Sequence, residues 1–286
     1  MRYRQHVRWL IVLLVACGGG KHGESSVAQP AATAATKLPE AAPYVTPGER
    51  MSYSLSLGEM ELATYDLAIG DVTDVAGKRA IVVQSHAKTV GLAKVVANID
   101  DTFTSWIDVT TGRPLRWVVD EFAVKGVDRE RTEARMTERT GTVVPMSFHL
   151  NDEPPKDEPQ TVSLPDVWDY NAFLIALRGW EAPIGSTVTA EVLRSRYLWN
   201  VKITIRGRER VVTPLGEFPA LRFDGHTFRL TRAGKRDADS DERALSIWIS
   251  DDADRVPLMT AARTDYGDIK MKIVEYVPGT GARLRR

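Results

Sequence analysis

The chain contains one thiol, and its position in the sequence is the first indication of chemistry. Cys17 follows an apolar run, Trp9 to Val15, and three arginines stand in the first eight residues. A positive segment, a short apolar segment and a cleavage site are the pattern of a secretory signal peptide. The apolar run is too short to cross a bilayer, which takes about 20 residues. The sequence therefore predicts that residues 1–16 are a signal peptide, cleaved before Cys17.

The four residues Leu14-Val15-Ala16-Cys17 resemble a bacterial lipobox. In that interpretation the Cys17 sulfur receives a diacylglyceryl group, and acyl chains hold the mature protein on a membrane. Two or three chains bind far better than one, at about 0.8 kcal/mol per buried methylene. A buried or incidental free cysteine is the alternative. If Cys17 is acylated, the mature chain can form no internal disulfide, although the expected compartment is oxidising.

Other side chains capable of chemistry form no recognisable catalytic set. The sequence has neither a Gly-x-Ser-x-Gly elbow nor a His-Glu-x-x-His motif, and His86, His149 and His226 are scattered. Asp237 to Asp241 begins like a calcium loop, but glutamate takes the sixth position and tryptophan the twelfth. We therefore predict a protein without enzymatic activity, with no catalytic residue, no cofactor and no metal site.

Composition divides the chain into a tether and a folded body. The sequence has 38 basic and 38 acidic residues, and cleavage before Cys17 leaves 35 basic against 38 acidic. A mildly acidic mature chain argues against nucleic acid as a partner. Residues 17–47 comprise the lipidated cysteine and a stretch rich in Gly, Ala, Ser, Thr and Pro, which predicts a flexible linker. We predict a single β-rich domain over 48–277 and a basic tail over 278–286.

Most of the body alternates apolar and polar residues with a period of two. Met51, Tyr53, Leu55 and Leu57 alternate with three serines, and the period returns at intervals as far as Tyr276. Such alternation predicts antiparallel hairpins with one buried face. The fold class is mostly β, with antiparallel meanders forming a curved open barrel or two-layer sandwich and one long helix packed on the sheet. Residues 91–99 fit either a short helix or a bent strand.

The one long helix is predicted near the middle of the chain. Asp166 can cap its start and Gly179 can follow its end, and apolar residues recur between them at helical spacing. The candidate ligand-facing residues on and beside this helix are Trp168, Tyr170, Leu174, Leu177 and Trp180. Core packing is the default interpretation of the two tryptophans, and a gate over a cavity is the functional one.

Two similar cassettes flank this helix. Trp106-Ile107-Asp108 is followed by a turn and Arg113-Pro114-Leu115, and Trp248-Ile249-Ser250 is followed by a turn and Arg255-Val256-Pro257-Leu258. Proline is tolerated at the first residue of a strand, where its missing N–H costs little. The repeat predicts two related β-meanders, one on each side of the helix.

The order of these features resembles an uncharacterised bacterial envelope family, domain of unknown function 3108. The segments that carry the resemblance are Gly48-Glu49-Arg50-Met51-Ser52-Tyr53, Asp101 to Leu115, Thr213 to Phe218, Trp248 to Leu258 and Val274-Glu275-Tyr276. The resemblance covers most of the mature chain. It implies an envelope location, and it assigns no catalytic residue because the family has no established activity.

Three hypotheses about function follow. The first is a lipid-anchored, periplasm-facing lipoprotein whose curved sheet binds an apolar or amphipathic envelope molecule. The second is a structural or assembly lipoprotein that binds another envelope protein, for example through an exposed strand edge. The third is a hydrolase with an unrecognised site. Gly18 is not the aspartate that favours inner-membrane retention in some lipoproteins, so we prefer the outer membrane as the location.

Overall fold

The computed structural model describes residues 37–96, 98–122, 128–264 and 267–285. The predicted signal peptide, Cys17 and the linker as far as residue 36 lie outside these ranges. Within them, no helix combines the length and the apolar character needed to span a membrane.

One large curved sheet forms the body. Its strands run in the order β11-β12-β13-β14-β15-β16-β17-β1-β2-β3-β4-β5-β6-β8-β9, and a second small sheet joins β7 to β10. Within the described ranges, β11 and β12 are the one parallel pair. The strands are β1 (Arg50–Leu57), β2 (Met60–Val75), β3 (Lys78–Thr89), β4 (Asp100–Asp108), β5 (Pro114–Phe122), β6 (Arg129–Arg135), β7 (Val143–Val144), β8 (Met146–Leu150), β9 (Lys156–Asp157), β10 (Gln160–Thr161), β11 (Val167–Asp169), β12 (Thr187–Arg194), β13 (Tyr197–Thr213), β14 (Gly216–Leu230), β15 (Arg243–Ser250), β16 (Pro257–Thr264) and β17 (Gly267–Val277).

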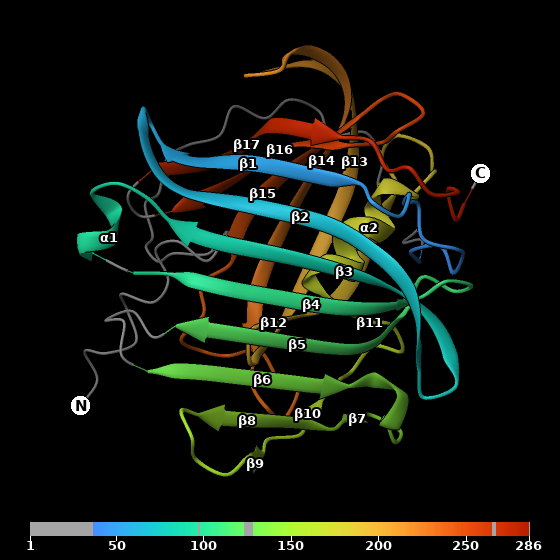
Figure 1. The fold of residues 1–286 in the computed structure, drawn as a ribbon, viewed down its shortest axis with the longest axis vertical. Coiled ribbons are helices and arrows are strands. Elements are labelled where there is room, and N and C mark those ends of the chain that lie inside the picture. The colour runs from blue at the N-terminus through green and yellow to red at the C-terminus, as the bar shows by residue number, and fades with distance from the viewer. Residues whose placement is uncertain (1–36, 97, 123–127, 265–266, 286) are drawn as a thin grey trace.

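The sheet curls around its longest helix. In Figure 1 the strands β1 to β6 cross the front of the molecule, while β12 to β14 run behind them at a steep angle. Helix α2 (Tyr170–Arg178) lies between the two layers, where it contacts β3 and β4 on one side and β11 and β12 on the other. Bulges in several ladders bend and twist the strands, which lets one sheet form both layers. The predicted fold class is therefore confirmed, with the helix enclosed by the sheet.

The period-two pattern explains which side chains face the helix. Met51, Tyr53 and Leu55 of β1 are each 1% exposed, whereas the serines between them lie on the outer face. The same alternation holds on β15, where Leu245 and Ile247 are buried. Burying these apolar groups contributes about 25 cal/mol for each Å² removed from water, which is what drives the sheet to close on itself.

The start of α2 differs from the prediction. Val167–Asp169 is extended because it pairs with β12, so the helix begins one turn later than expected. Its N-cap is Asp169, whose carboxylate accepts a hydrogen bond from the Ala172 N–H at 2.8 Å. Asp166, the predicted cap, instead forms an ion pair with Arg113 at 2.9 Å. The end of the helix at Gly179 is confirmed.

The ambiguous stretch 91–99 contains the short helix α1 (Ala93–Val96), which connects β3 to β4. A one-turn 3₁₀ helix (Met136–Glu138) follows β6.

The two repeated cassettes form the same kind of hairpin. In the β4–β5 pair the register shifts between Trp106 and Ile107, and Ile107 then pairs with Pro114. In the β15–β16 pair the register shifts between Trp248 and Ile249, and Ile249 then pairs with Pro257. Both hairpins therefore carry a bulge at the Trp-Ile step and place proline opposite the isoleucine.

The body begins before the predicted boundary at residue 48. Leu38 and Val45 are 3% and 1% exposed, so this part of the predicted linker packs into the core. The Ala41 N–H donates to the Thr111 carbonyl at 3.1 Å. At the other end of the chain, the Leu284 N–H donates to the Val45 carbonyl at 3.1 Å, so part of the predicted basic tail also packs against the body. Composition missed both segments because their few apolar residues show no periodicity.

The segment after the edge strand β9 contacts the ends of β13 and β14. Glu158, just after β9, forms ion pairs with Arg196 and Arg232, which flank β13 and β14. Gln160 adds a hydrogen bond from its side-chain amide to the Thr231 carbonyl at 2.9 Å. Ion pairs and hydrogen bonds thus join the β9 side of the sheet to the ends of β13 and β14.

Candidate functional site

Chain direction distinguishes two ends of the sheet. One, which we call the α1 end, carries the turn between β1 and β2, helix α1, the last residue of β12 (Arg194) and the first residue of β15 (Arg243). The other, which we call the Arg178 end, carries the start of β1, the turn between β15 and β16, and the last residue of α2. Because α2 begins beside the last residues of β12, it runs from the α1 end to the Arg178 end.

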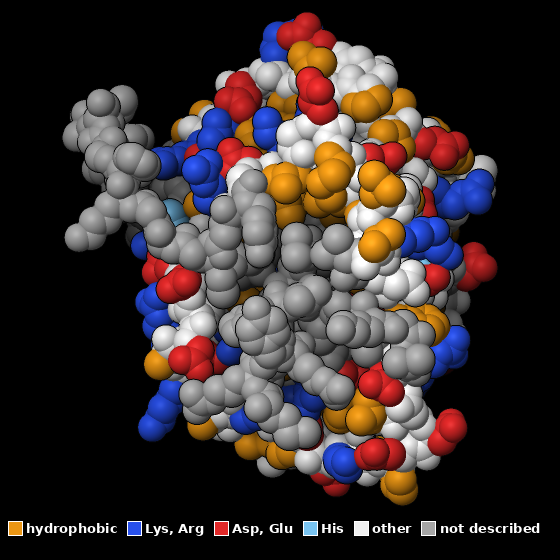
Figure 2. Space-filling view, turned by 90° about the vertical axis from the view of Figure 1, so that its left-hand side faces the viewer, with side chains coloured by type: hydrophobic (Ala, Val, Ile, Leu, Met, Phe, Trp, Pro, Cys, Tyr) orange, Lys and Arg blue, Asp and Glu red, His pale blue; other side chains and the backbone are white. Residues whose placement is uncertain are grey.

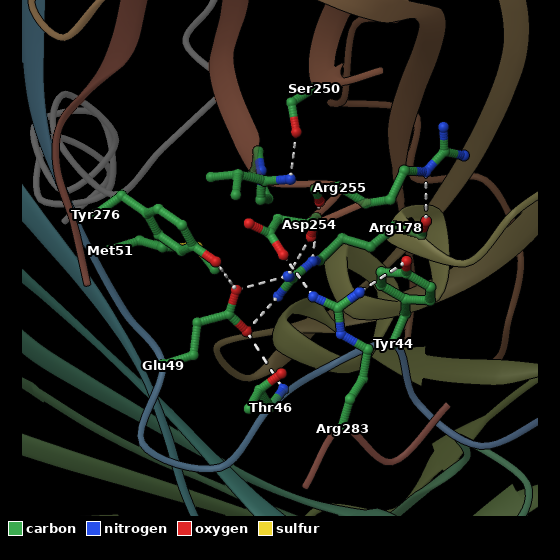
Figure 3. A network of polar contacts seen from close by, with 12 residues as sticks. Tyr44, Thr46, Glu49, Met51, Arg178, Ser250, Asp254, Arg255, Tyr276 and Arg283 are labelled. Carbon is green, nitrogen blue, oxygen red and sulfur yellow. Dashed lines mark hydrogen bonds and ion pairs between the residues drawn. The ribbon is translucent and has the colours of Figure 1, made fainter. Parts of the chain in front are cut away.

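The Arg178 end is built around a buried ion pair (Figure 3). Arg178 and Glu49 have side chains only 2% exposed, and their two hydrogen bonds measure 2.7 and 3.0 Å. The remaining Arg178 donors reach the carbonyls of Asp254 at 2.8 Å and Arg255 at 3.0 Å. Every nitrogen of this guanidinium therefore has a partner, as a buried charge requires.

The same network ties distant parts of the chain together. The Tyr276 hydroxyl donates to Glu49 at 3.2 Å, and Arg283 pairs with Asp254 while lying over the Tyr44 ring. Burial and the nearby Glu49 raise the pKa of Tyr276, so its hydroxyl stays a donor at neutral pH. The network joins the N-terminal segment, α2, one turn and the C-terminal segment, and it has the arrangement of a structural clamp.

The α1 end has a different inner face. Arg243 is 7% exposed and shares the buried face of β15 with Leu245 and Ile247. Its Nε and Nη1 atoms have no hydrogen-bond partner among the residues that the structure describes. Thr227 of β14 is its ladder partner on one side, and continuation of the β15–β16 register places Thr264 on the other. A buried guanidinium is thus flanked by two threonines.

Arg194 is a second arginine of interest at this end. It is partly buried, and it faces the side chains of Tyr170, Glu121, Asp101 and Tyr65. Desolvation lowers the pKa of Arg194 to about 10, and burial raises the pKa of Tyr170 to about 12. Both side chains therefore remain protonated at neutral pH, and each can donate hydrogen bonds.

The carboxylates near Arg194 are engaged by neighbours. Asp101 accepts a hydrogen bond from the Phe122 N–H at 3.0 Å, and Glu121 accepts one from the Ser195 hydroxyl. Because Ser195 lies in the turn between β12 and β13, the Ser195–Glu121 contact joins the front and rear layers at the α1 end.

Asp169 lies at the start of α2 and is fully buried. Its Oδ1 accepts hydrogen bonds from the Ser105 hydroxyl at 2.7 Å and the Ala172 N–H at 2.8 Å. Burial raises the pKa of Asp169 to about 7, because these two donors only partly offset the loss of water around the charge. The helix cap is therefore a titratable group near neutral pH.

The outer face of the sheet carries a polar groove of about 360 Å³, lined in part by Asp100, Asp120, Arg131 and His149. Asp120 pairs with Arg131 at 2.9 Å, and His86 lies 2.6 Å from Asp100. The hydrogen bond from His86 is the main cause of the lowered pKa of Asp100. His86 is partly exposed, and these paired charges fit a solvated surface.

The structure separates the five candidate residues on and beside α2. Trp168, Leu174, Leu177 and Trp180 are at most 3% exposed and belong to the hydrophobic core. Trp180 stacks on Phe223, with ring centroids 5.9 Å apart. A ligand-facing role for these four stays a prediction. Only Tyr170 is partly exposed, and it lies with Arg194 at the α1 end.

Sequence reasoning missed the two arginines of the α1 end. The available signal was the period of β15, in which Arg243 occupies an inward position continuous with Leu245, Ile247 and Ile249. An arginine in phase with three buried apolar residues is unusual, because lone charges are rarely buried.

Comparisons with known proteins agree with this architecture. Among curated proteins, none matches the sequence significantly. A solved β-barrel-like protein of domain of unknown function DUF1849 from Brucella abortus is similar in fold, with a TM-score of 0.51 and 11% identity, over 83% of this chain and 99% of that one. At this identity the similarity supports the fold alone.

Two further solved structures are more distant. A Bacteroides fragilis protein with a YmcC-like fold has a TM-score of 0.39 and 5% identity, over 84% of this chain and 99% of its own. The hypothetical lipoprotein YmcC from Escherichia coli has a TM-score of 0.30 and 8% identity, over 81% of this chain and 86% of its own. The family model described as "Protein of unknown function (DUF3108)" matches residues 52–274, which include both ends of the sheet, and the chain therefore belongs to the DUF3108 family.

Proposed function

We propose that this protein is a lipid-anchored protein of the bacterial cell envelope, facing the periplasm, that binds an amphipathic envelope molecule at the α1 end of its sheet. We favour the outer membrane, because residue 18 is glycine and not the aspartate that favours inner-membrane retention in some lipoproteins. The proposal includes no catalytic step.

The lipobox-like sequence supports the anchor. Cys17 follows Leu14-Val15-Ala16, and the preceding segment has the charge and length of a signal peptide. Acyl chains on Cys17 would hold the body near a bilayer, where amphipathic molecules are concentrated.

Polar side chains at two places inside the curled sheet carry the binding function, Arg194 with Tyr170 at one place and Arg243 on β15 at the other. Arg194, Arg243 and Tyr170 bring hydrogen-bond donors to an inner face that is otherwise formed mainly by apolar side chains. Ligand sites commonly combine apolar walls with a few placed polar groups that orient the ligand. This arrangement suits a molecule with an apolar body and a polar head.

Exposed apolar side chains near α1 support the same conclusion. Leu92 and Val95 are 82% and 86% exposed, and Met60 of the adjacent β1–β2 turn is 52% exposed. Figure 2 faces this side of the molecule and shows apolar side chains gathered among charged ones. Exposed apolar groups of this kind mark sites of contact with a membrane or an apolar ligand.

Two measurements test the proposal in the native cells. Labelled palmitate should appear on the full-length protein and be absent from the Cys17→Ala variant. Organic-solvent extraction of the purified protein, followed by mass spectrometry, should release a recurring amphipathic molecule in near-stoichiometric amount. If the protein is not labelled, the proposed lipid anchor is wrong. If the extract contains no such molecule, the proposed binding function is wrong.

A further inference from the structure

Arg243 poses a specific physical problem. It is more than nine-tenths buried, yet its Nε and Nη1 have no partner among the described residues. Removing a charge from water without a partner is costly, and buried charges in proteins are normally paired. Arg178 shows how this protein solves the problem elsewhere, with a bidentate carboxylate and two carbonyls.

The ladder neighbours of Arg243 provide no carboxylate of the kind that pairs with Arg178. Its ladder neighbours are Thr227 and, by continuation of the register, Thr264, which are 4% and 6% exposed. Threonine hydroxyls cannot neutralise a cation, and the Thr264 O–H already donates to the Gly267 carbonyl at 2.7 Å. On the inner face of β16, the Thr260 hydroxyl is also buried without a partner in the described part of the chain. Arg243 and Thr260 thus have polar atoms without a described partner on this part of the inner face, and the ladder neighbours of Arg243 are not acidic.

Three buried acidic residues of the α1 end lie on other strands. Asp101 is on β4, which five strands separate from β15 in the sheet order, and Glu121 and Glu130 follow on β5 and β6. None of these three acids is therefore a ladder neighbour of Arg243.

We propose that Arg243, with Thr227 and Thr264 beside it, binds the anionic group of a ligand, a phosphate or a carboxylate. A guanidinium presents a planar fork of donors that matches two oxygens of either group, and the pairing would give Nε and Nη1 the acceptors that the described residues do not provide. This inference rests on the proposed function and specifies the head group of its ligand. It also distinguishes Arg243 from a structural arginine, whose partners come from the protein itself.

The test uses the full-length protein purified in non-ionic detergent. Three probes are titrated: phosphatidic acid, diacylglycerol with the same acyl chains, and inorganic phosphate. Arg243→Gln removes the charge, Arg243→Lys retains it without the fork, and Arg263→Gln is the matched control. Arg263 lies on the neighbouring strand with its side chain 71% exposed and paired with Asp268, so it should have no part in binding.

Phosphatidic acid should bind the unchanged protein at least tenfold more tightly than diacylglycerol does. Arg243→Gln should abolish this preference, Arg243→Lys should retain part of it, and Arg263→Gln should leave it unchanged. Competition by inorganic phosphate at comparable concentration would support the anion site and assign it to a free anion. No loss in Arg243→Gln, or an equal loss in Arg263→Gln, would overturn the inference.

The two proposals can fail separately. If the molecule extracted from the native protein has no acidic group, the binding function stands and the anion site is wrong. If no molecule co-purifies but Arg243→Gln loses phosphate binding, the anion site stands and the binding of an amphipathic molecule is wrong. Thermal unfolding of each variant, measured without probe, separates lost binding from lost folding.

Discussion

Arg178 and Arg243 are both buried on the inside of the same sheet, at opposite ends, and they differ in their partners. Arg178 has a bidentate carboxylate and two carbonyl acceptors (Figure 3). Two nitrogens of Arg243 have none within the described residues. The first arrangement uses a buried charge to join four segments of the chain. The second leaves two buried donors without a described partner, which is unusual because buried polar groups are normally hydrogen-bonded.

The largest expected loss of stability comes from replacing Arg178. Arg178→Met leaves the Glu49 carboxylate buried without its counter-ion, so we expect a loss of about 3–5 kcal/mol in unfolding free energy. Chemical denaturation measures it. The double variant Arg178→Met with Glu49→Leu should recover most of the loss, because no buried charge then remains unpaired. A loss below about 1 kcal/mol in the single variant would contradict the clamp.

Asp169, at the start of the helix that links the two ends, makes stability depend on pH. Its pKa is about 7 in the folded protein, against 3.8 as the ordinary value. The folded state therefore binds the Asp169 proton more tightly than the unfolded state does. The resulting stabilisation is complete below pH 4 and is lost as the pH rises through 7. The unfolding free energy should decline by an amount on the order of 4 kcal/mol, at 1.36 kcal/mol for each pKa unit.

Asp169→Asn keeps a capping oxygen and removes the titration. Its unfolding free energy should stay flatter between pH 4 and pH 8 than that of the unchanged protein, and it should exceed the latter at pH 8. Asp166→Asn, outside the helix, should retain the original slope. Parallel pH profiles for Asp169→Asn and the unchanged protein would show that the cap does not titrate in this range.

A glycine near the Arg178 end tests whether the N-terminal segment belongs to the body. Gly112 has a φ of +72°, and a Cβ there would lie 2.6 Å from the Ala41 carbonyl oxygen. We expect Gly112→Ala to cost about 2 kcal/mol, from the left-handed conformation and from displacement of the segment around Ala41. Gly77 has a φ of +76° and nothing within 4 Å, so Gly77→Ala measures the conformational cost alone. Equal losses would mean that the Ala41 contact contributes nothing.

The smallest expected effect completes the comparison of the two arginines. Arg243→Met removes a buried guanidinium whose Nε and Nη1 have no hydrogen-bond partner among the described residues, so the unfolding free energy should stay within about 1 kcal/mol of the original, or rise. The same substitution thus has opposite consequences at the two ends. A loss of the size expected for Arg178→Met would show that Arg243 has a structural partner, and the distinction between the two ends would fail.

The sequence anticipated much of the fold because strands leave a local signal. The alternation around Met51 to Leu57 predicted a half-buried strand, and the Trp-Ile steps at 106 and 248 predicted two related hairpins, which share the same bulge. It misplaced the start of α2, since the pairing of Val167–Asp169 with β12 overrides local helix signals there. It also assigned Leu38 and Val45 to a linker, because their burial depends on surfaces formed elsewhere.

The site depended on information that no local pattern contains. From the sequence alone came the single acylatable cysteine, the β-rich class, the helix and Tyr170 as one candidate residue. Tertiary structure decided that Arg178 meets Glu49, 129 residues away, and that Arg243 has threonines as its neighbours. The physical reason is that burial and pairing of a charge depend on how distant strands come together, whereas hydrophobic periodicity is set within a few consecutive residues.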